Sequence, residues 1–175
     1  MELLTEDEIE DRWARALSMD DSDRAAAWRG LKTKQLTLFA WLGHRGETRF
    51  EPEVAELLIS TATLIWAVFA EDEDEDDDDQ QLLTVGPDEL AKLEEVNAPI
   101  LQMLSEDEAL KTSFEERFDN LVYHLEEGLD QQHLFQLAFE RLDDAHADRN
   151  PELNDFNFAL LLFFLKILID ALDGE

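Results

Sequence analysis

Carboxylate side chains at helical spacing are the residues of this sequence whose types and positions suit chemistry. Residues 115–119 read Glu-Glu-Arg-Phe-Asp, and residues 140–143 read Glu-Arg-Leu-Asp. Side chains three or four residues apart lie on one face of a helix, and carboxylates placed in this way can hold Mg²⁺ for phosphate chemistry. The candidate metal ligands are Glu116, Asp119, Glu140 and Asp143.

The two acidic segments together resemble the EExxE…ExxD pattern of the all-α nucleoside-triphosphate pyrophosphatases. The resemblance covers residues 115–143 and differs at Asp119, where the family has Glu. It implies an all-α, Mg²⁺-dependent nucleotide phosphohydrolase that holds its metal with these carboxylates. Water-facing helix surfaces of an acidic chain show the same spacing, so the phosphohydrolase is the alternative function. The function that we favour is that of a non-enzymatic binding module, which needs no cofactor.

Basic side chains gather in one segment of the chain. Residues 24–49 hold six Lys and Arg against a single acid, Glu47. We expect most of these bases to pair with acids of later helices. The alternative is a pocket for a phosphate or carboxylate in a turn or loop over residues 43–46. Its residues would be His44, Arg45 and Arg49, together with the backbone amides of Gly43 and Gly46.

Negative charge is the dominant property of the chain. It has 44 Asp and Glu against 14 Lys and Arg, which gives a formal net charge of −30. Nucleic acids and anionic membrane surfaces bind proteins through basic surfaces, so the composition disfavours direct binding to either. The complete lack of Cys excludes disulfide bonds, Cys-ligated zinc and thiol catalysis.

The acidic charge has three interpretations: a docking surface for a basic protein, adaptation to high salt, or solubility alone. We favour docking, because acids held on rigid helices can imitate the phosphates of a nucleic acid. Such a module would occupy the nucleic-acid site of a basic protein as a mimic, inhibitor, immunity factor or chaperone. The candidate docking residues are Asp88, Glu94, Glu95, Glu106, Asp107, Glu115, Glu116, Glu126 and Glu127.

The elements that position these side chains are predicted to be helices. Apolar residues recur at i, i+3 and i+4, which is typical of amphipathic helices. The sequence therefore predicts one all-α domain over residues 1–175, a bundle of about seven or eight helices. Segments 54–70 and 155–172 are apolar on nearly every face, so we expect them at the centre. The nine acids from Glu71 to Asp79 predict a mobile acidic loop over residues 71–81.

Several residues mark where the helices begin and end. Thr5 and Glu8 have the spacing of a capping box, which predicts the start of the first helix. Pro99 is expected to kink or end its helix near Asn97, because proline removes a backbone hydrogen bond. Ser105 is expected to cap the helix that follows.

The C-terminal helix, residues 155–172, has very few positions suited to water. Either it passes through the middle of the bundle or one of its faces meets a second chain. A homodimer through this apolar helix is therefore a further prediction. Aromatic residues on the apolar sides of the earlier helices are expected to pack in the core. They are Trp13, Trp28, Trp41 and Trp66.

The N-terminal residues MELLTEDEIE are acidic and lack the basic start and apolar stretch of a signal peptide. The two most apolar segments are shorter than the ~20 residues that a spanning helix needs. We therefore expect a cytoplasmic protein that has no membrane partner.

Overall fold

The computed structural model describes residues 4–70, 84–106, 121–126, 129, 131–147 and 155–174. Every regular element within these ranges is an α-helix, which confirms the all-α bundle. The named helices are α1 (Glu6–Ser18), α2 (Asp21–Lys34), α3 (Leu36–Arg49), α4 (Pro52–Ala70), α5 (Pro87–Glu106), α7 (Gln132–Ala147) and α8 (Asp155–Asp173). Residues 121–126 are also helical. The acidic loop predicted over residues 71–81 lies outside the described residues.

The N-termini of α1 and α2 are held by side-chain caps. Thr5 Oγ1 accepts a hydrogen bond from the Glu8 amide at 3.4 Å, and Glu8 Oε2 accepts one from the Thr5 amide at 2.8 Å. This reciprocal pair confirms the predicted capping box. Asp20 Oδ1 caps α2 by accepting from the amides of Ser22 and Asp23 at 2.8 and 2.9 Å. Both caps satisfy N–H groups that a first helical turn leaves without a partner.

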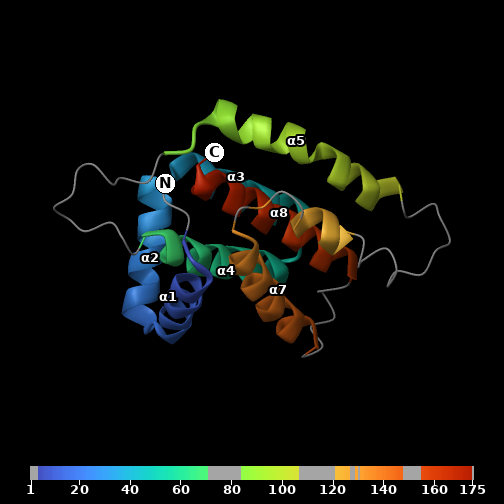
Figure 1. The fold of residues 1–175 in the computed structure, drawn as a ribbon. Helices are drawn as coiled ribbons and strands as arrows, with labels where there is room; N and C mark the ends of the chain where they lie inside the picture. The colour runs from blue at the N-terminus through green and yellow to red at the C-terminus, as the bar shows by residue number, and fades with distance from the viewer. Residues whose placement is uncertain are drawn as a thin grey trace.

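The central element is α4, which contacts α1, α2, α3, α7 and α8. Figure 1 shows it crossing the molecule below α8, with α1 and α2 at one end. Leu58, Ile65 and Trp66 along α4 are at most 2% exposed. Among the described helices, α4 is long and apolar enough to cross a membrane, and 56% of its apolar window is buried inside the protein. A core helix has the same composition.

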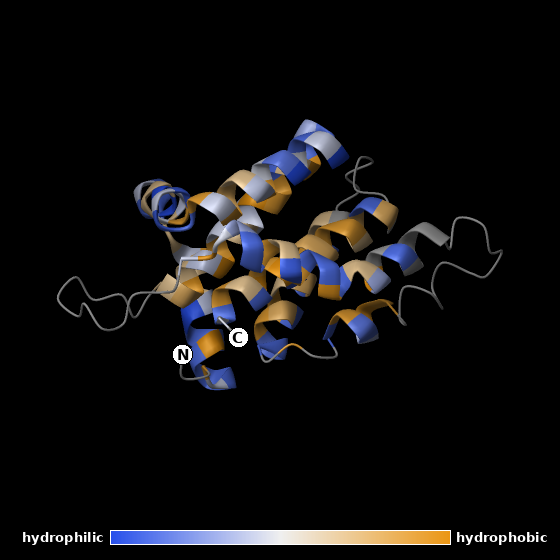
Figure 2. Ribbon diagram, turned by 90° about the horizontal axis from the view of Figure 1, so that it is seen from above, coloured by the Kyte–Doolittle hydropathy of each residue, from blue (hydrophilic) through white to orange (hydrophobic). Residues whose placement is uncertain are grey.

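Helix α8 packs against α4, α5 and α7. Its apolar side chains from Phe158 to Ile169 are at most 4% exposed, which confirms that α4 and α8 are the central helices. Phe164 meets Trp41 and Phe50 edge-on, at centroid distances of 5.5 and 5.9 Å. Figure 2 shows apolar positions turned toward neighbouring helices. One chain covers most of this apolar surface, although Phe156 at the start of α8 is 45% exposed, and the homodimer through α8 stays a prediction.

The turn predicted over residues 43–46 is wrong, because α3 continues through both glycines to Arg49. Gly46 is buried on the side of α3 that faces α4. A Cβ atom at Gly46 would stand 3.4 Å from the Cβ of Ala55 on α4. This glycine therefore allows two helices to approach closely, which is a tertiary role that the local pattern did not reveal.

Of the kink or end predicted near Asn97, the end is wrong, since α5 runs past Pro99 to Glu106. Pro99 is on the exposed side of α5, where water can reach the carbonyl that proline leaves without a donor. On the buried side, Asn97 Nδ2 donates to the Leu93 carbonyl at 2.8 Å and to Asp170 Oδ2 on α8 at 3.5 Å. Ser105, predicted to cap the next helix, lies in the last turn of α5.

The Trp residues do not share one environment. Trp13 and Trp66 are buried as predicted, at 5% and 2% exposure, and Trp41 is partly buried. Trp28 is 37% exposed, so the prediction is wrong for this residue. Gly30 brings α2 close to α4, because its Cβ atom would stand 3.0 Å from Trp66 Nε1. Trp28 is two residues before Gly30, and residues two apart point to nearly opposite sides of a helix. Because Gly30 faces α4, Trp28 lies at the margin of the core.

Candidate functional site

The predicted docking residues fall on α5, on the short helical segment before α7, and outside the described residues. Asp88 and Glu95 are exposed on α5. They are seven residues apart, so they share one face of the helix. Glu94 and Glu126 are half-buried. Glu106 is the last residue of α5, and Asp107, Glu115, Glu116 and Glu127 lie outside the described residues.

Glu94 takes part in an internal contact. Its Oε1 accepts a hydrogen bond from Trp41 Nε1 at 3.0 Å and forms an ion pair with the guanidinium of Arg45. The side chains of this pair are 28% and 34% exposed. Since Trp41 and Arg45 belong to α3, the contact joins α3 to α5. Glu94 is therefore a structural residue, and Arg45 meets the expectation that bases pair with acids of later helices.

The anion pocket predicted on α3 lacks the loop on which it depended. His44 and Arg49 are exposed, and Arg45 is bound to Glu94. Both glycine amides of the predicted loop lie inside α3, where helical geometry directs each to the carbonyl four residues earlier. Those amides are therefore not available to an anion.

Two other basic side chains are also turned toward the interior. Lys166, with a side chain that is 6% exposed, donates to Asp170 Oδ2 at 2.8 Å. Arg12 Nη1 donates to the carbonyl of Val68 on α4 at 3.2 Å. These two cations therefore make contacts inside the bundle.

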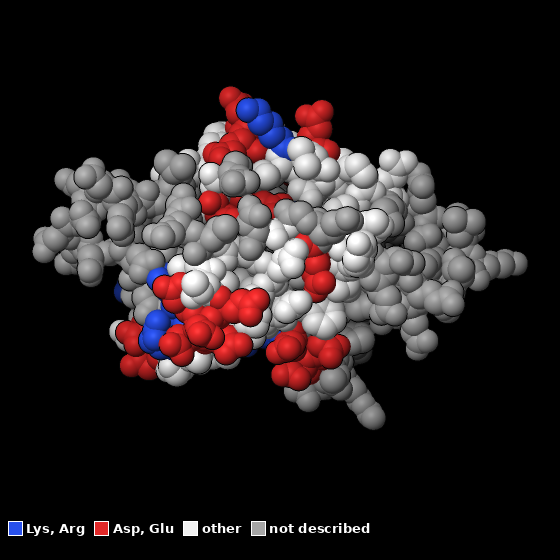
Figure 3. All heavy atoms as spheres, viewed as in Figure 1, with Lys and Arg blue, Asp and Glu red and all other residues white. Residues whose placement is uncertain are grey.

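Exposed acids gather on the outer sides of α1 and α7, two helices that contact each other. His133 Nε2 on α7 lies 3.1 Å from Glu10 Oε1 on α1. Figure 3 shows acidic side chains gathered over both helices. We call this surface the α1–α7 acidic face. Its exposed residues are Glu6, Asp7, Glu10, Asp11, Glu140, Asp143 and Asp144.

The α1 part of this face was missed in the sequence, because residues 1–49 carry nearly as many bases as acids. A signal was nevertheless present. Buried Ile9 and Trp13 are one helical turn apart, which places Asp7 and Asp11 on the outer side. Net charge summed over residues 1–49 hides this face, because most bases of that segment lie on α2 and α3.

The alternative metal site is only half described. Glu140 and Asp143 are exposed on α7 and three residues apart. Glu116 and Asp119 lie outside the described residues, so the convergence of the four carboxylates stays a prediction. Within the part of the chain that the structure describes, no group of three or more His, Asp or Glu side chains is placed to hold a metal ion.

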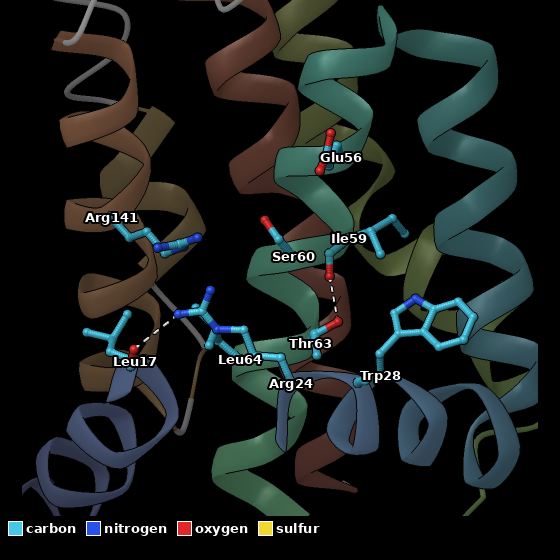
Figure 4. A pocket seen from close by; sticks show the side chains of 10 residues that line it. Leu17, Arg24, Trp28, Glu56, Ile59, Ser60, Thr63, Leu64 and Arg141 are labelled. Atoms are coloured by element: carbon cyan, nitrogen blue, oxygen red, sulfur yellow. Dashed lines mark hydrogen bonds between the residues drawn. The ribbon is translucent and has the colours of Figure 1, made fainter. Parts of the chain in front are cut away.

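A pocket of about 350 Å³ opens between α2, α4 and α7, beside the C-terminal end of α1. Figure 4 shows Arg24 and Arg141 on one side of it and Trp28 on the other. No local sequence motif predicts this pocket, because Arg24 and Arg141 belong to helices that are far apart in the chain.

Comparison with known proteins assigns no family to the chain. No protein family, curated protein or solved structure matches it. The resemblance of residues 115–119 and 140–143 to the pyrophosphatases therefore rests on the motif alone.

Proposed function

We propose that this chain is an acidic helical binding module that docks on the basic surface of another protein. The observation that supports this function is the α1–α7 acidic face, where exposed carboxylates stand on two helices in contact. The partner is a protein that otherwise binds nucleic acid. The module acts on it as a mimic of nucleic acid, in the role of inhibitor, immunity factor or chaperone.

The acidic face is carried on a firmly packed support. Ile9 and Trp13 fix the inner side of α1, and Leu134 and Leu142 fix the inner side of α7. Carboxylates on such a surface keep set positions, as the phosphates of a nucleic acid do. Fixed charge complementarity accelerates association and selects among partners, and its effect falls as salt rises.

The test is affinity capture from native cell lysate, at low salt and again at about 0.5 M salt, where surface charges are strongly screened. We expect the chain to retain a basic, nucleic-acid-binding protein at low salt, and we expect added DNA or RNA to compete it off. Retention of no such protein at low salt overturns the proposal.

Matched variants show whether the face or the bulk charge is responsible. One variant carries Asp11→Asn, Glu140→Gln, Asp143→Asn and Asp144→Asn on the α1–α7 acidic face. The control carries Asp21→Asn, Glu47→Gln, Glu51→Gln and Glu53→Gln, which are exposed acids outside the predicted docking residues and the acidic face. Both variants lose four negative charges. The proposal expects the first to lose retention and the control to keep most of it, whereas equal losses contradict a defined docking face.

One observation favours the Mg²⁺-dependent phosphohydrolase as a second candidate function. Glu140 and Asp143 are exposed on one helix at the spacing that metal-binding carboxylates use. The assay is Mg²⁺-dependent hydrolysis of nucleoside triphosphates by the purified chain. Activity that is lost in Asp143→Asn and kept in Asp144→Asn supports this function, and no activity in the unmodified chain removes it.

The salt-adaptation interpretation predicts a different response. Thermal stability would then rise steeply and keep rising into molar salt. Screening of self-repulsion alone levels off once the Debye length falls to ~3 Å near 1 M salt. Melting temperatures measured over a series of salt concentrations therefore separate salt adaptation from ordinary screening of self-repulsion, and this experiment needs no knowledge of the partner.

A further inference from the structure

The pocket between α2, α4 and α7 is lined by two arginines, Arg24 and Arg141. Arg24 Nη2 donates to the carbonyl of Leu17, at the end of α1, over 3.3 Å. Arg141 Nε donates to Thr61 Oγ1 over 3.4 Å. Among the residues that the structure describes, neither arginine forms an ion pair. A guanidinium has five N–H donors, so each arginine keeps most of its donors for another acceptor.

The two guanidinium groups are placed on the same side of the pocket. Figure 4 shows Arg24 rising from α2 and Arg141 reaching in from α7. Burial and then the charge of Arg24 lower the pKa of Arg141. Glu56 also lines the pocket, and Figure 4 shows it on α4 away from both guanidinium groups. Two cations therefore lie close together in a strongly acidic chain, and no described acid forms an ion pair with either.

The opposite side of the pocket is apolar and aromatic. Ile59 lines it from α4, and Trp28 closes it from α2. The Trp28 ring is held edge-on against Phe39, with centroids 5.4 Å apart. Its 37% exposure shows that part of the ring is open to solvent.

A hydroxyl lies between the cationic side and the aromatic side. Ser60 Oγ lines the pocket from α4 and donates to the Leu57 carbonyl at 3.0 Å. In Figure 4 it stands between Arg141 and Trp28. The hydroxyl oxygen keeps its acceptor capacity for a polar group of a ligand.

We propose that this pocket binds a small phosphomonoester, whose phosphate lies between Arg24 and Arg141 and whose flat apolar or aromatic body rests against Trp28 and Ile59. Guanidinium groups recognise phosphate oxygens through paired N–H donors. A phosphomonoester carries a charge of about −1.5 to −2 at neutral pH, which matches two arginines better than a carboxylate does. A pocket of about 350 Å³ is within the range of small-molecule sites. A nucleoside monophosphate has this combination of groups.

The proposal is tested by calorimetric titration of the full chain with phenyl phosphate, adenosine monophosphate, benzoate and inorganic phosphate. Both phosphomonoesters are expected to bind saturably, and more tightly than inorganic phosphate or benzoate. Loss of one charged hydrogen-bonding partner is expected to weaken their binding roughly tenfold to a hundredfold in Arg24→Gln and in Arg141→Gln.

The chain offers a matched control on the same helix as Arg24. Arg29 is exposed on α2 and does not line the pocket, so Arg29→Gln removes the same charge elsewhere. This control is expected to bind within twofold of the unmodified chain. Trp28→Ala is expected to weaken binding of both phosphomonoesters while leaving inorganic phosphate unchanged. Circular dichroism confirms that each variant is folded.

Three results would overturn the proposal. The first is no saturable binding of either phosphomonoester at millimolar concentration. The second is equal weakening by Arg24→Gln and Arg29→Gln, which indicates attraction by overall charge. The third is equal binding of benzoate and phenyl phosphate, which removes the preference for phosphate.

Discussion

Two half-buried arginine sites of this molecule differ in how their charge is balanced. Arg45 on α3 meets the carboxylate of Glu94 on α5, and the indole of Trp41 donates to the same oxygen. Arg141 on α7 meets a neutral hydroxyl, Thr61 Oγ1, and has a second cation, Arg24, nearby. Both contacts join two helices, but the charge of Arg45 is balanced by a carboxylate, whereas Arg141 forms no ion pair with a described residue.

The difference is informative because acids are abundant. A charge removed from water is costly unless it is paired. In a chain with 44 Asp and Glu, a half-buried Arg141 beside an exposed Arg24, with no ion pair to a described acid, is not explained by a shortage of partners. The contrast therefore separates cations that stabilise the fold from cations that are available to a ligand.

The largest effect is expected at the buried ion pair of Lys166 with Asp170, whose side chains are 6% and 15% exposed. Asp170→Leu leaves the Lys166 charge buried alone. We expect the free energy of unfolding to fall by about 3–5 kcal/mol, measured by urea denaturation. The double variant Lys166→Met with Asp170→Leu should recover much of this loss, and a single variant as stable as the parent would contradict the assignment.

The next effect is expected at Glu94, which balances Arg45. Glu94→Gln removes the charge that faces the guanidinium but keeps an acceptor for Trp41 Nε1. Since both charged side chains are about one-third exposed, we expect a smaller loss of roughly 1–3 kcal/mol in the free energy of unfolding. The control is Glu95→Gln, an exposed neighbour, which should stay within ~0.5 kcal/mol of the parent.

Helix positions and caps were predictable because local patterns determine them. The capping box at Thr5 and the apolar spacing of α4 and α8 are properties of short segments, and all three are present. The errors occurred where a tertiary contact decides the outcome. Helix α3 continues through Gly46, which is buried and packs against Ala55 of α4. At Pro99, α5 continues because its buried side is held against α8 while the proline faces solvent.

The candidate sites were predictable only in part. Exposed acids such as Asp88 and Asp143 follow from the helical pattern, which assigns apolar and polar residues to opposite faces. The engagement of Glu94 by Arg45 does not follow, because it depends on how α5 lies against α3. The approach of Arg24 to Arg141 depends on α2 and α7 both packing on α4, which no local pattern encodes.

A direct comparison of the two arginine sites uses the same substitution at each. Arg141→Met removes a half-buried charge that has no acid, so we expect the free energy of unfolding to rise by about 0.5–1 kcal/mol. Arg45→Met removes the cation that pairs with the Glu94 carboxylate, so the free energy of unfolding should fall. Urea denaturation in phosphate-free buffer is the measurement, because a bound anion would stabilise the unmodified chain. Equal destabilisation at both positions contradicts the contrast between the sites.

The smallest effect is expected at Glu8, an exposed acid in the first turn of α1. Hydrogen bonds from the Thr5 hydroxyl and then the Thr5 amide lower the pKa of Glu8. A carboxyl whose pKa is lowered by folding adds stability above its ordinary pKa, and this contribution is lost as pH falls through the lowered value. The melting temperature of the parent should therefore exceed that of Glu8→Ala at neutral pH.

This difference should stay constant down to about pH 5 and shrink on further acidification, since an unperturbed Glu titrates near ~4.3. Asp11→Ala is the control, because Asp11 is exposed on the same helix beyond its first turn. A difference that grows as the pH falls would show that Glu8 does not hold the helix end as a charged group. The pH series thus separates an acid that caps its own helix from the neighbouring acids of the face, whose charge is directed outward.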